Sequence, residues 1–229
     1  DYLNGQLGVG TNFDVLYRVV TIGGRNACVY MIDGFCKDEV MQKLLQHFIG
    51  ITEDKMPSDA HEMSKQLVPY GEVDLEDEWE KIEYSVMSGV VAMFIDGYDR
   101  CILIDARTYP ARGVAEPEKD KVLRGSKDGF VETIVFNTAL IRRRIRSPQL
   151  RMEMLKAGTN SQTDIVLCYM DDRVDRDFLE KIRSRINSLQ VDALTLNQES
   201  LAECLYKRRW YNPFPKFKYS ERPDTCLLY

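Results

Sequence analysis

The stretch EPEKDKVLRGSKDGFVETIVFNTALIRRRIR, residues 116–146, joins three segments of different character. An acidic, proline-containing loop leads into a turn that contains Gly125 and Gly129, and both features favour irregular, exposed backbone. Apolar residues then recur at helical spacing from Val131 to Ile145. The helix ends in four arginines within five positions, Arg142, Arg143, Arg144 and Arg146. This stretch therefore predicts a loop or hinge that leads into the first helix of a second folding unit.

The length and composition of the chain agree with two small folding units. The chain has 229 residues, of which 44% are hydrophobic and 29% charged, a composition typical of a globular protein with a buried core. We expect a first α/β subdomain, an interlobe loop or hinge, a second α/β subdomain and a linker rich in proline and aromatic residues, at residues 1–107, 108–130, 131–206 and 207–229.

The first subdomain is predicted to contain two hairpins and two helices. The β-rich runs 13–22 and 26–33 flank Gly23-Gly24, a pair that permits a tight turn. Amphipathic spacing predicts helices over 37–50 and 74–88, and in the second of these the acidic residues would form the solvated face. The apolar runs 90–95 and 100–106 predict a second hairpin that is buried on both faces.

The second subdomain is predicted to be a small sheet with helices packed on it. After the helix that ends at Arg146, residues 150–157 and 163–170 have the pattern of strands, the second of them buried. Asp175 is placed to cap a further helix. A short strand at 193–196, a helix at 197–206 and an irregular tail at 211–224 complete the prediction. The fold class is α/β, or more loosely α+β, with helices flanking each sheet.

Composition argues against several functional classes. The net charge of −5 disfavours a general nucleic-acid binder. Six cysteines without CxxC spacing indicate free thiols in a reducing compartment, and two histidines are too few for an imidazole metal site. The sequence has no phosphate loop, nucleophile elbow or zinc motif, so we predict no enzyme, no metal and no cofactor. No apolar run is long enough to cross a bilayer, although a chain that starts without methionine and ends after a proline-rich segment is expected to be part of something longer.

Four arginines exceed what a helix dipole requires, and two interpretations remain open. They form a structural ion-pair network with Glu116, Glu118 and Asp120 of the loop or of a neighbouring subunit, or they bind an anionic ligand in an interlobe cleft. Arg142 and Arg146 are expected to share one helical face. The residues assigned to ligand binding or to interlobe and subunit contacts are Asp96, Tyr109, Arg112, Glu116, Glu118, Arg124, Asp128, Arg142, Arg143, Arg144 and Arg146.

Several long motifs together resemble a known family. TYPARGVAEPEKDKVLRGSKDGFVETIVFNTALIRRRIR, RMEMLKAG, QTDIVLCYM, DALTLNQESLAECL and RRWYNPFPKFKYSERPD follow one another in order. They resemble the N-terminal domain of GerA-type A subunits of bacterial spore germinant receptors and of the SpoVAF-like paralogues. The resemblance covers nearly the whole chain and is looser over residues 1–100. Thr108 and Gln162 depart from the commoner motif.

The resemblance implies a location, partners and a fold. Such proteins belong to the spore inner membrane, and a soluble domain, expected to face the spore core cytoplasm, precedes membrane helices that begin shortly after Glu221-Arg222-Pro223-Asp224. The expected partners are B- and C-type receptor subunits or an accessory membrane protein, with further copies of the same chain in a homo-oligomer. The fold implied is two subdomains similar to the lobes of substrate-binding proteins. The function implied is a signalling and assembly domain in nutrient-triggered germination and ion release; the alternative is direct binding of a nutrient or anion in the interlobe cleft.

Overall fold

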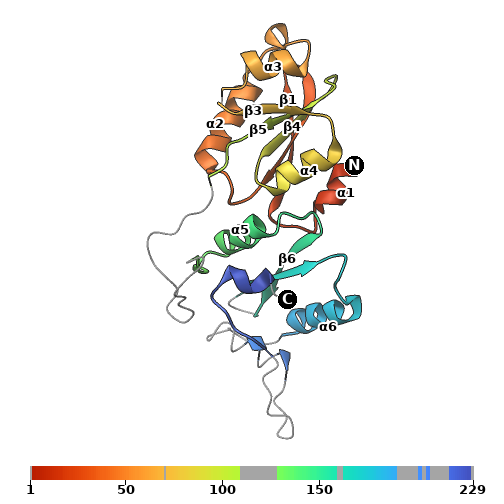
Figure 1. Ribbon diagram of the computed structural model, residues 1–229, viewed down its shortest axis with the longest axis vertical. Coiled ribbons are helices and arrows are strands. Elements are labelled where there is room, and N and C mark those ends of the chain that lie inside the picture. The colour runs from red at the N-terminus through yellow and green to blue at the C-terminus, as the bar shows by residue number, and fades with distance from the viewer. Residues whose placement is uncertain are drawn as a thin grey trace, which may run out of the picture.

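The computed structural model describes residues 2–69, 71–108, 128–158, 162–189, 201–202, 205–206 and 217–227. Figure 1 shows an elongated molecule with a five-stranded sheet at one end and a two-stranded sheet at the other. We call the elements from α1 to β5 the large lobe and those from α5 to η2 the small lobe. The fold is mixed α/β, as predicted, whereas the exact domain boundaries stay a prediction.

The large lobe is built on an antiparallel sheet in the order β1-β2-β4-β5-β3. The strands in sequence order are β1 Val15–Ile22, β2 Arg25–Ile32, β3 Val73–Glu76, β4 Val91–Ile95 and β5 Cys101–Ile104. Both predicted hairpins are present. Gly23 and Gly24 have φ angles of +51° and +76° in the first turn, a conformation that glycine adopts without steric cost.

Helices cover both faces of this sheet (Figure 1). The helices are α1 Tyr2–Leu7, α2 Asp38–Ile49, α3 Ala60–Gln66 and α4 Trp79–Met87, with a short 3₁₀ turn η1 at Glu53–Lys55. Leu44 and Phe48 of α2 and Met63 of α3 pack on one face. Leu7 of α1 and Val86 of α4 pack on the other. The lobe therefore has three layers, with apolar side chains buried on both sides of the sheet.

The predicted helix over 74–88 is wrong in its first third. Residues Val73–Glu76 form β3 at an edge of the sheet, and α4 begins only at Trp79. The Oε1 of Glu76 accepts hydrogen bonds from the amides of Asp77 and Glu78, which fixes the turn between strand and helix. The acidic run is not all solvated either, because Glu83 is buried.

The small lobe sandwiches a β-hairpin between two helices. Its elements are α5 Ile134–Arg144, β6 Leu150–Ala157, β7 Thr163–Met170, α6 Arg176–Asn187 and the 3₁₀ helix η2 Pro223–Leu227. Ile141 of α5 packs with Met152 on one face of the hairpin, and Ile186 of α6 packs with Ala157 on the other. Asp175 caps α6 as predicted, since its carboxylate accepts from the amide of Phe178.

Two predictions for this lobe are corrected, and others lie outside the described residues. β7 is only partly buried and its Cys168 is exposed, so the buried strand expected there is wrong. The tail is also regular from Pro223 onwards, where η2 begins. The predicted strand 193–196 lies outside the described residues, as does most of the predicted helix 197–206 and the part of the tail at 211–216. No helix in the described parts of the chain is long and apolar enough to cross a membrane.

The segment before β1 ties the two lobes together. The amide of Phe13 donates to the carbonyl of Met152 (3.1 Å), and the amide of Met152 donates to Oδ1 of Asn12 (2.7 Å). Asn12 is itself buried and donates to the carbonyl of Leu7. The segment that leads into β1 therefore hydrogen-bonds directly to β6 of the small lobe, and α5 lies at this junction (Figure 1).

Candidate functional site at the junction of the lobes

The structure brings together part of the predicted residue set. Arg142, Arg143 and Arg144 form the last turn of α5, and Arg146 follows two residues later. Asp128 joins them through an ion pair with Arg144. Asp96 does not join them, since it is exposed at the turn after β4, at the end of the sheet opposite Asp14. Tyr109, Arg112, Glu116, Glu118 and Arg124 lie outside the described residues.

Arg142 is completely buried and holds the base of the large sheet. Its Nε and Nη2 donate to the two carboxylate oxygens of Asp14 at 2.5 and 3.0 Å, and its Nη1 lies 3.2 Å from the sulfur of Met87. The side chains of Arg142 and Asp14 are 0% and 1% exposed. This fork-on-carboxylate geometry is the strongest that arginine offers, and it satisfies two charges that water cannot reach.

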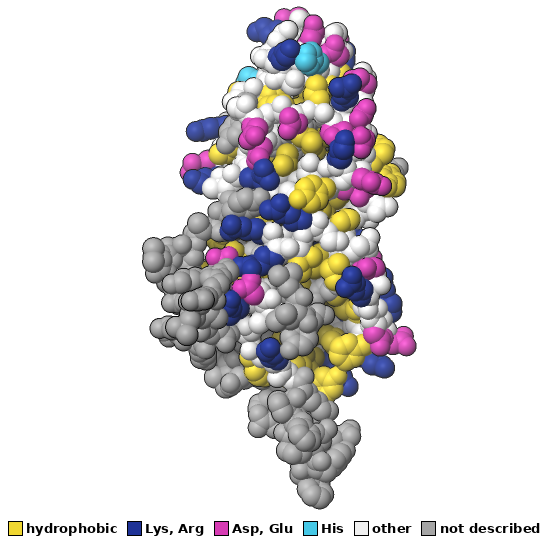
Figure 2. All heavy atoms as spheres, viewed as in Figure 1, with side chains coloured by type: hydrophobic (Ala, Val, Ile, Leu, Met, Phe, Trp, Pro, Cys, Tyr) yellow, Lys and Arg dark blue, Asp and Glu magenta, His cyan; other side chains and the backbone are white. Residues whose placement is uncertain are grey.

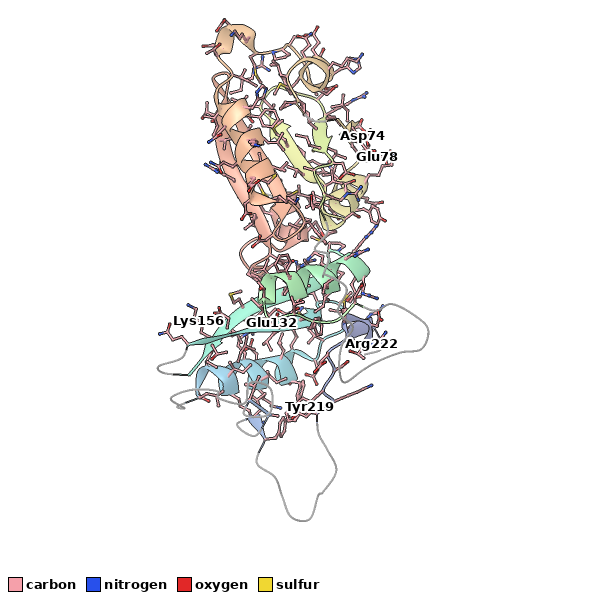
Figure 3. All side chains as sticks on the ribbon, turned by 90° about the vertical axis from the view of Figure 1, so that its left-hand side faces the viewer. Asp74, Glu78, Glu132, Lys156, Tyr219 and Arg222 are labelled. Carbon is pink, nitrogen blue, oxygen red and sulfur yellow. The ribbon has the colours of Figure 1, made fainter. Side chains whose placement is uncertain are left out.

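Arg144 holds the C-terminal segment of the described chain. Its Nη2 donates to Asp128 at 2.8 Å, and its Nη1 pairs with Asp224 at the start of η2. Asp224 also accepts from Arg222 at 2.7 Å. Figure 3 shows Arg222 beside η2, below α5. The two carboxylates on Arg144 therefore fasten both the segment that enters α5 and the segment around η2 to the end of the helix.

The two arginines point to opposite sides of α5. Positions i and i+2 of a helix are about 200° apart around its axis, so Arg142 and Arg144 contact different lobes. The expectation that Arg142 and Arg146 share a helical face is wrong, because α5 ends at Arg144 and Arg146 is exposed beyond it. Among the described residues the cluster binds Asp14, Asp128 and Asp224; the predicted partners Glu116, Glu118 and Asp120 lie outside the described residues, so their pairing stays a prediction.

Arg146 lines a pocket. The pocket has a volume of about 250 Å³, and its lining includes the cations Arg107 and Arg146 and the acids Glu72, Asp74 and Asp105. Nη1 of Arg146 lies 3.4 Å from the hydroxyl of Tyr84, a long hydrogen bond. A second hollow of about 530 Å³ adjoins it along β3 and α4. Asp74 lines both hollows and lies in the large lobe, above the junction (Figure 3).

Ionisation around this pocket is set by the arginines. Arg107 donates to Asp105 through Nε (2.7 Å) and Nη2, which lowers the pKa of the Asp105 carboxyl. The hydrogen bond from Arg146 lowers the pKa of the Tyr84 hydroxyl. Figure 2 shows Lys and Arg side chains gathered across the middle of the molecule, at the level of the junction. The site suits carboxylate partners, and the described residues contain no group of acids, histidines and cysteines that could hold a metal ion.

Comparison of the sequence with known proteins identifies its family. A sequence profile of the Bacillus/Clostridium GerA spore germination protein matches residues 1–228. The chain belongs to the GerA family. The GerA-type resemblance seen in the motifs is thereby confirmed.

Several relatives of this GerA-family chain are spore proteins. It is 36% identical over 227 residues to stage V sporulation protein AF of Bacillus subtilis, which covers 99% of this chain and 46% of the relative. It is 32% identical to uncharacterized membrane protein YfkQ and 27% identical to spore germination protein KA, both of B. subtilis, with 93% and 95% of this chain and 41% and 40% of the relatives covered. The GerA-family chain thus spans less than half the length of these relatives.

A solved structure shares the fold of the GerA-family chain. It is the crystal structure of the N-terminal domain of the A subunit of the Bacillus megaterium spore germinant receptor GerK3, with a TM-score of 0.69 and 25% sequence identity. The match covers 98% of this chain and 83% of the other. A similarity over both lobes at this level supports the α/β assignment of the whole described structure.

Sequence reasoning about this GerA-family chain missed three residues of the junction. Asp14 was read only as part of a β-rich run, although a carboxylate at the start of an apolar strand needs a buried partner. Asp224 was recognised as part of a motif without a role. Tyr84 gave no signal in the sequence at all. The arrangement can link a β-sheet, a helix and a C-terminal segment through charge, and it can hold a carboxylate near Arg146.

Proposed function

We propose that this chain is the soluble signalling and assembly domain of a spore-membrane protein that takes part in nutrient-triggered germination and ion release. In this role it catalyses no reaction and needs no cofactor. Its task is to pass a change of conformation between partner subunits and the membrane part of the full-length protein.

One observation carries this proposal: α5 binds the large lobe and the C-terminal segment through arginines on opposite sides. Arg142 is bound to Asp14 beneath the five-stranded sheet, and Arg144 is bound to Asp224 of η2. A displacement of the large lobe that carries α5 with it through Arg142 therefore acts on the segment around Asp224 through Arg144. A buried ion pair is stable only in one geometry, so it is either formed or broken. This property suits an element that switches between two states.

The membrane and partner assignments rest on the relatives. The chain spans less than half of their length, one is named a membrane protein, and the GerK3 neighbour is an A subunit of a germinant receptor. We place the full-length protein in the spore inner membrane, this domain on the side of the spore core cytoplasm, and the membrane segment after Glu221-Arg222-Pro223-Asp224. Its partners in this proposal are B- and C-type subunits or an accessory membrane protein, together with further copies of itself.

The test uses Arg144→Ala, with Arg173→Ala as the matched control because Arg173 is 80% exposed. In the 229-residue chain, we expect Arg144→Ala to speed amide hydrogen exchange at residues 224–227 while the five-stranded sheet keeps its protection. In spores that carry the full-length protein, the same variant should slow cation release after nutrient addition, and Arg173→Ala should not. Normal release from spores in which Arg144→Ala is folded and has freed η2 would refute the coupling role.

A second candidate function is supported by the pocket at Arg146. Arg107, Arg142 and Arg144 are held by carboxylates, so a direct ligand site would depend on Arg146 and Tyr84. These groups would take a small carboxylate or a zwitterion, with Glu72 or Asp74 facing an ammonium group. Calorimetric titration of the chain with amino acids, sugars and inorganic anions tests this. Saturable binding that Arg146→Ala abolishes would support it, and no binding by any of these probes would refute it.

A further inference from the structure

Strand β1 forms one edge of the five-stranded sheet. Within the described part of the chain it pairs only with β2, and all eight residues are in register from Val15 opposite Ile32 to Ile22 opposite Arg25. No bulge interrupts the strand, it contains no proline, and Arg18 is its single charged residue. Soluble proteins normally protect edge strands with charges, prolines, bulges or a covering element. An edge this long and apolar is therefore built to pair with another strand.

Three apolar side chains along this edge are exposed. Val19 is 57% exposed, and Leu16 and Tyr17 are also exposed. Val19 and Tyr17 lie on the sheet face that carries α1 and α4, and there Tyr17 begins a strip of aromatic rings whose centroids are 5.0 to 6.0 Å apart. This aromatic strip consists of Tyr17, Tyr30, Phe94, Trp79 and Tyr2. A strand added beside β1 would cover Val19 and the exposed end of the strip.

The hairpin geometry tells which backbone groups of β1 face outward. Ile22 and Arg25 close a two-residue turn, and the pair that closes such a turn exchanges both of its backbone hydrogen bonds. Hydrogen-bonded and non-bonded pairs alternate along an antiparallel ladder. The N–H and C=O groups of Thr21, Val19 and Tyr17 therefore point away from β2, toward an added strand.

We propose that β1 binds β1 of a second copy of this chain in an antiparallel, two-fold pair centred on Val19. The two sheets then form one continuous sheet. Val19 lies opposite Val19 of the second copy, and Tyr17 lies opposite Thr21, so the outward backbone groups of each strand meet their counterparts. This inference rests on the assembly part of the proposed function and identifies the surface that performs it.

The register and the occupant follow from charge and strand direction. A two-fold axis normal to the sheet leaves the same face of both copies on the same side of the joined sheet. Side chains alternate between faces along a strand, so two directly opposite residues must both have odd or both have even numbers. A register centred on Arg18 would set two cations opposite each other, which is destabilising, whereas centring on Val19 sets Arg18 opposite Val20. Head-to-tail pairing with the other edge, β3, is less favourable because β1 and β3 run in the same direction and β3 has only four residues.

Sedimentation equilibrium of the 229-residue chain, at increasing concentration, is the first test. We expect a monomer–dimer equilibrium, and Val19→Lys should weaken the dimer at least about tenfold because it places a charge at the centre of the interface. Phe178→Lys is the matched control, since Phe178 is 47% exposed on α6 of the small lobe, at the opposite end of the molecule from β1 (Figure 1). A chain that stays monomeric throughout, or a dimer that Val19→Lys leaves unchanged, would overturn the proposal.

Disulfide cross-linking tests the register, in a Cys168→Ser background that removes the exposed thiol of β7. With diamide as oxidant, Val19→Cys should give a covalent dimer, because opposite hydrogen-bonded residues have Cα atoms about 5.5 Å apart, within disulfide range. Thr21→Cys is the control: its two copies would be offset by four residues, roughly 13 Å, and should not cross-link. Cross-linking through Thr21→Cys and not Val19→Cys would refute this register, and neither result depends on the germination assay of the Arg144→Ala variant.

Discussion

Breaking the buried pair between Arg142 and Asp14 should be among the most damaging single changes in this chain. Both charges are inaccessible to water, and they share two hydrogen bonds at 2.5 and 3.0 Å. Removing one partner leaves the other as an uncompensated buried charge, which costs about 3–5 kcal/mol. We expect Arg142→Met and Asp14→Asn each to lower the free energy of unfolding by an amount in this range, which is a large part of the stability of an ordinary domain.

The double-mutant cycle separates the pair from the packing of its side chains. Since neither charge remains in the Arg142→Met, Asp14→Asn double variant, we expect it to cost at least about 2 kcal/mol less than the sum of the two single changes. The assay is urea unfolding followed by circular dichroism. Arg100→Ala is the control, because Arg100 and Asp99 form an exposed pair at 3.9 Å whose loss should change stability by no more than about 0.5 kcal/mol. If Arg142→Met costs as little as Arg100→Ala, or if the single changes simply add, the reasoning is refuted.

Three further predictions concern the large lobe and α6. Glu83 is 8% exposed, and its Oε1 has no hydrogen-bond partner among the described residues. Burial raises the pKa of its carboxyl group in the folded chain. The free energy of unfolding therefore falls as the pH rises from the pKa of the unfolded chain, near 4.3, through the higher pKa of the folded chain. Glu83→Gln should therefore gain about 1 kcal/mol at pH 7 and nothing below about pH 4, as urea titrations at several pH values would show. Gly89→Ala should cost about 2–4 kcal/mol, since φ is +95° and a Cβ would lie 2.8 Å from the ring of Phe35, whereas Gly5→Ala, with open space around it, should be neutral or stabilising; thermal unfolding of both variants decides. Asp175→Ala should cost about 1 kcal/mol through the lost cap of α6, and an unchanged unfolding midpoint would contradict this role of the cap.

Local patterns predicted most elements of the fold but not their spatial order. Gly23-Gly24 between two β-rich runs, and Asp175 before an apolar stripe, each predicted an element that the structure confirms. The helix predicted over 74–88 was partly wrong because Leu75 and Trp79 have helical spacing by coincidence, while Val73–Glu76 pairs with β5, a strand distant in sequence. Pairing between distant strands depends on the whole sheet, which no short window of sequence contains.

The sequence predicted the charge of the candidate site but not the partners found for it. An excess of arginines at a helix end favoured ion pairs, because the helix dipole alone needs fewer cations, and Arg142 and Arg144 form such pairs with Asp14, Asp128 and Asp224. Asp14 lies 128 residues before Arg142, and their pairing follows only once the large sheet and α5 have taken their places. Long-range partners of this kind are set by tertiary packing, so the sequence could predict the charge of the cluster but not what it holds.

The position of α5 restricts how the two lobes can move. A guanidinium–carboxylate pair is lost when the charged atoms separate beyond about 4 Å, which is less than the 5.4 Å rise of one helical turn. Because Arg142 and Arg144 point to opposite sides, a helix that slides or rotates toward one partner moves away from the other. Either α5 moves as one body with Asp14 and Asp224, or one of the two pairs breaks. The partly exposed pair at Arg144 is the one that gives way, since breaking the fully buried pair at Arg142 leaves two charges with neither a partner nor water. A switch in this domain is therefore expected to release the segment around Asp224 first, while the large lobe stays bound to α5.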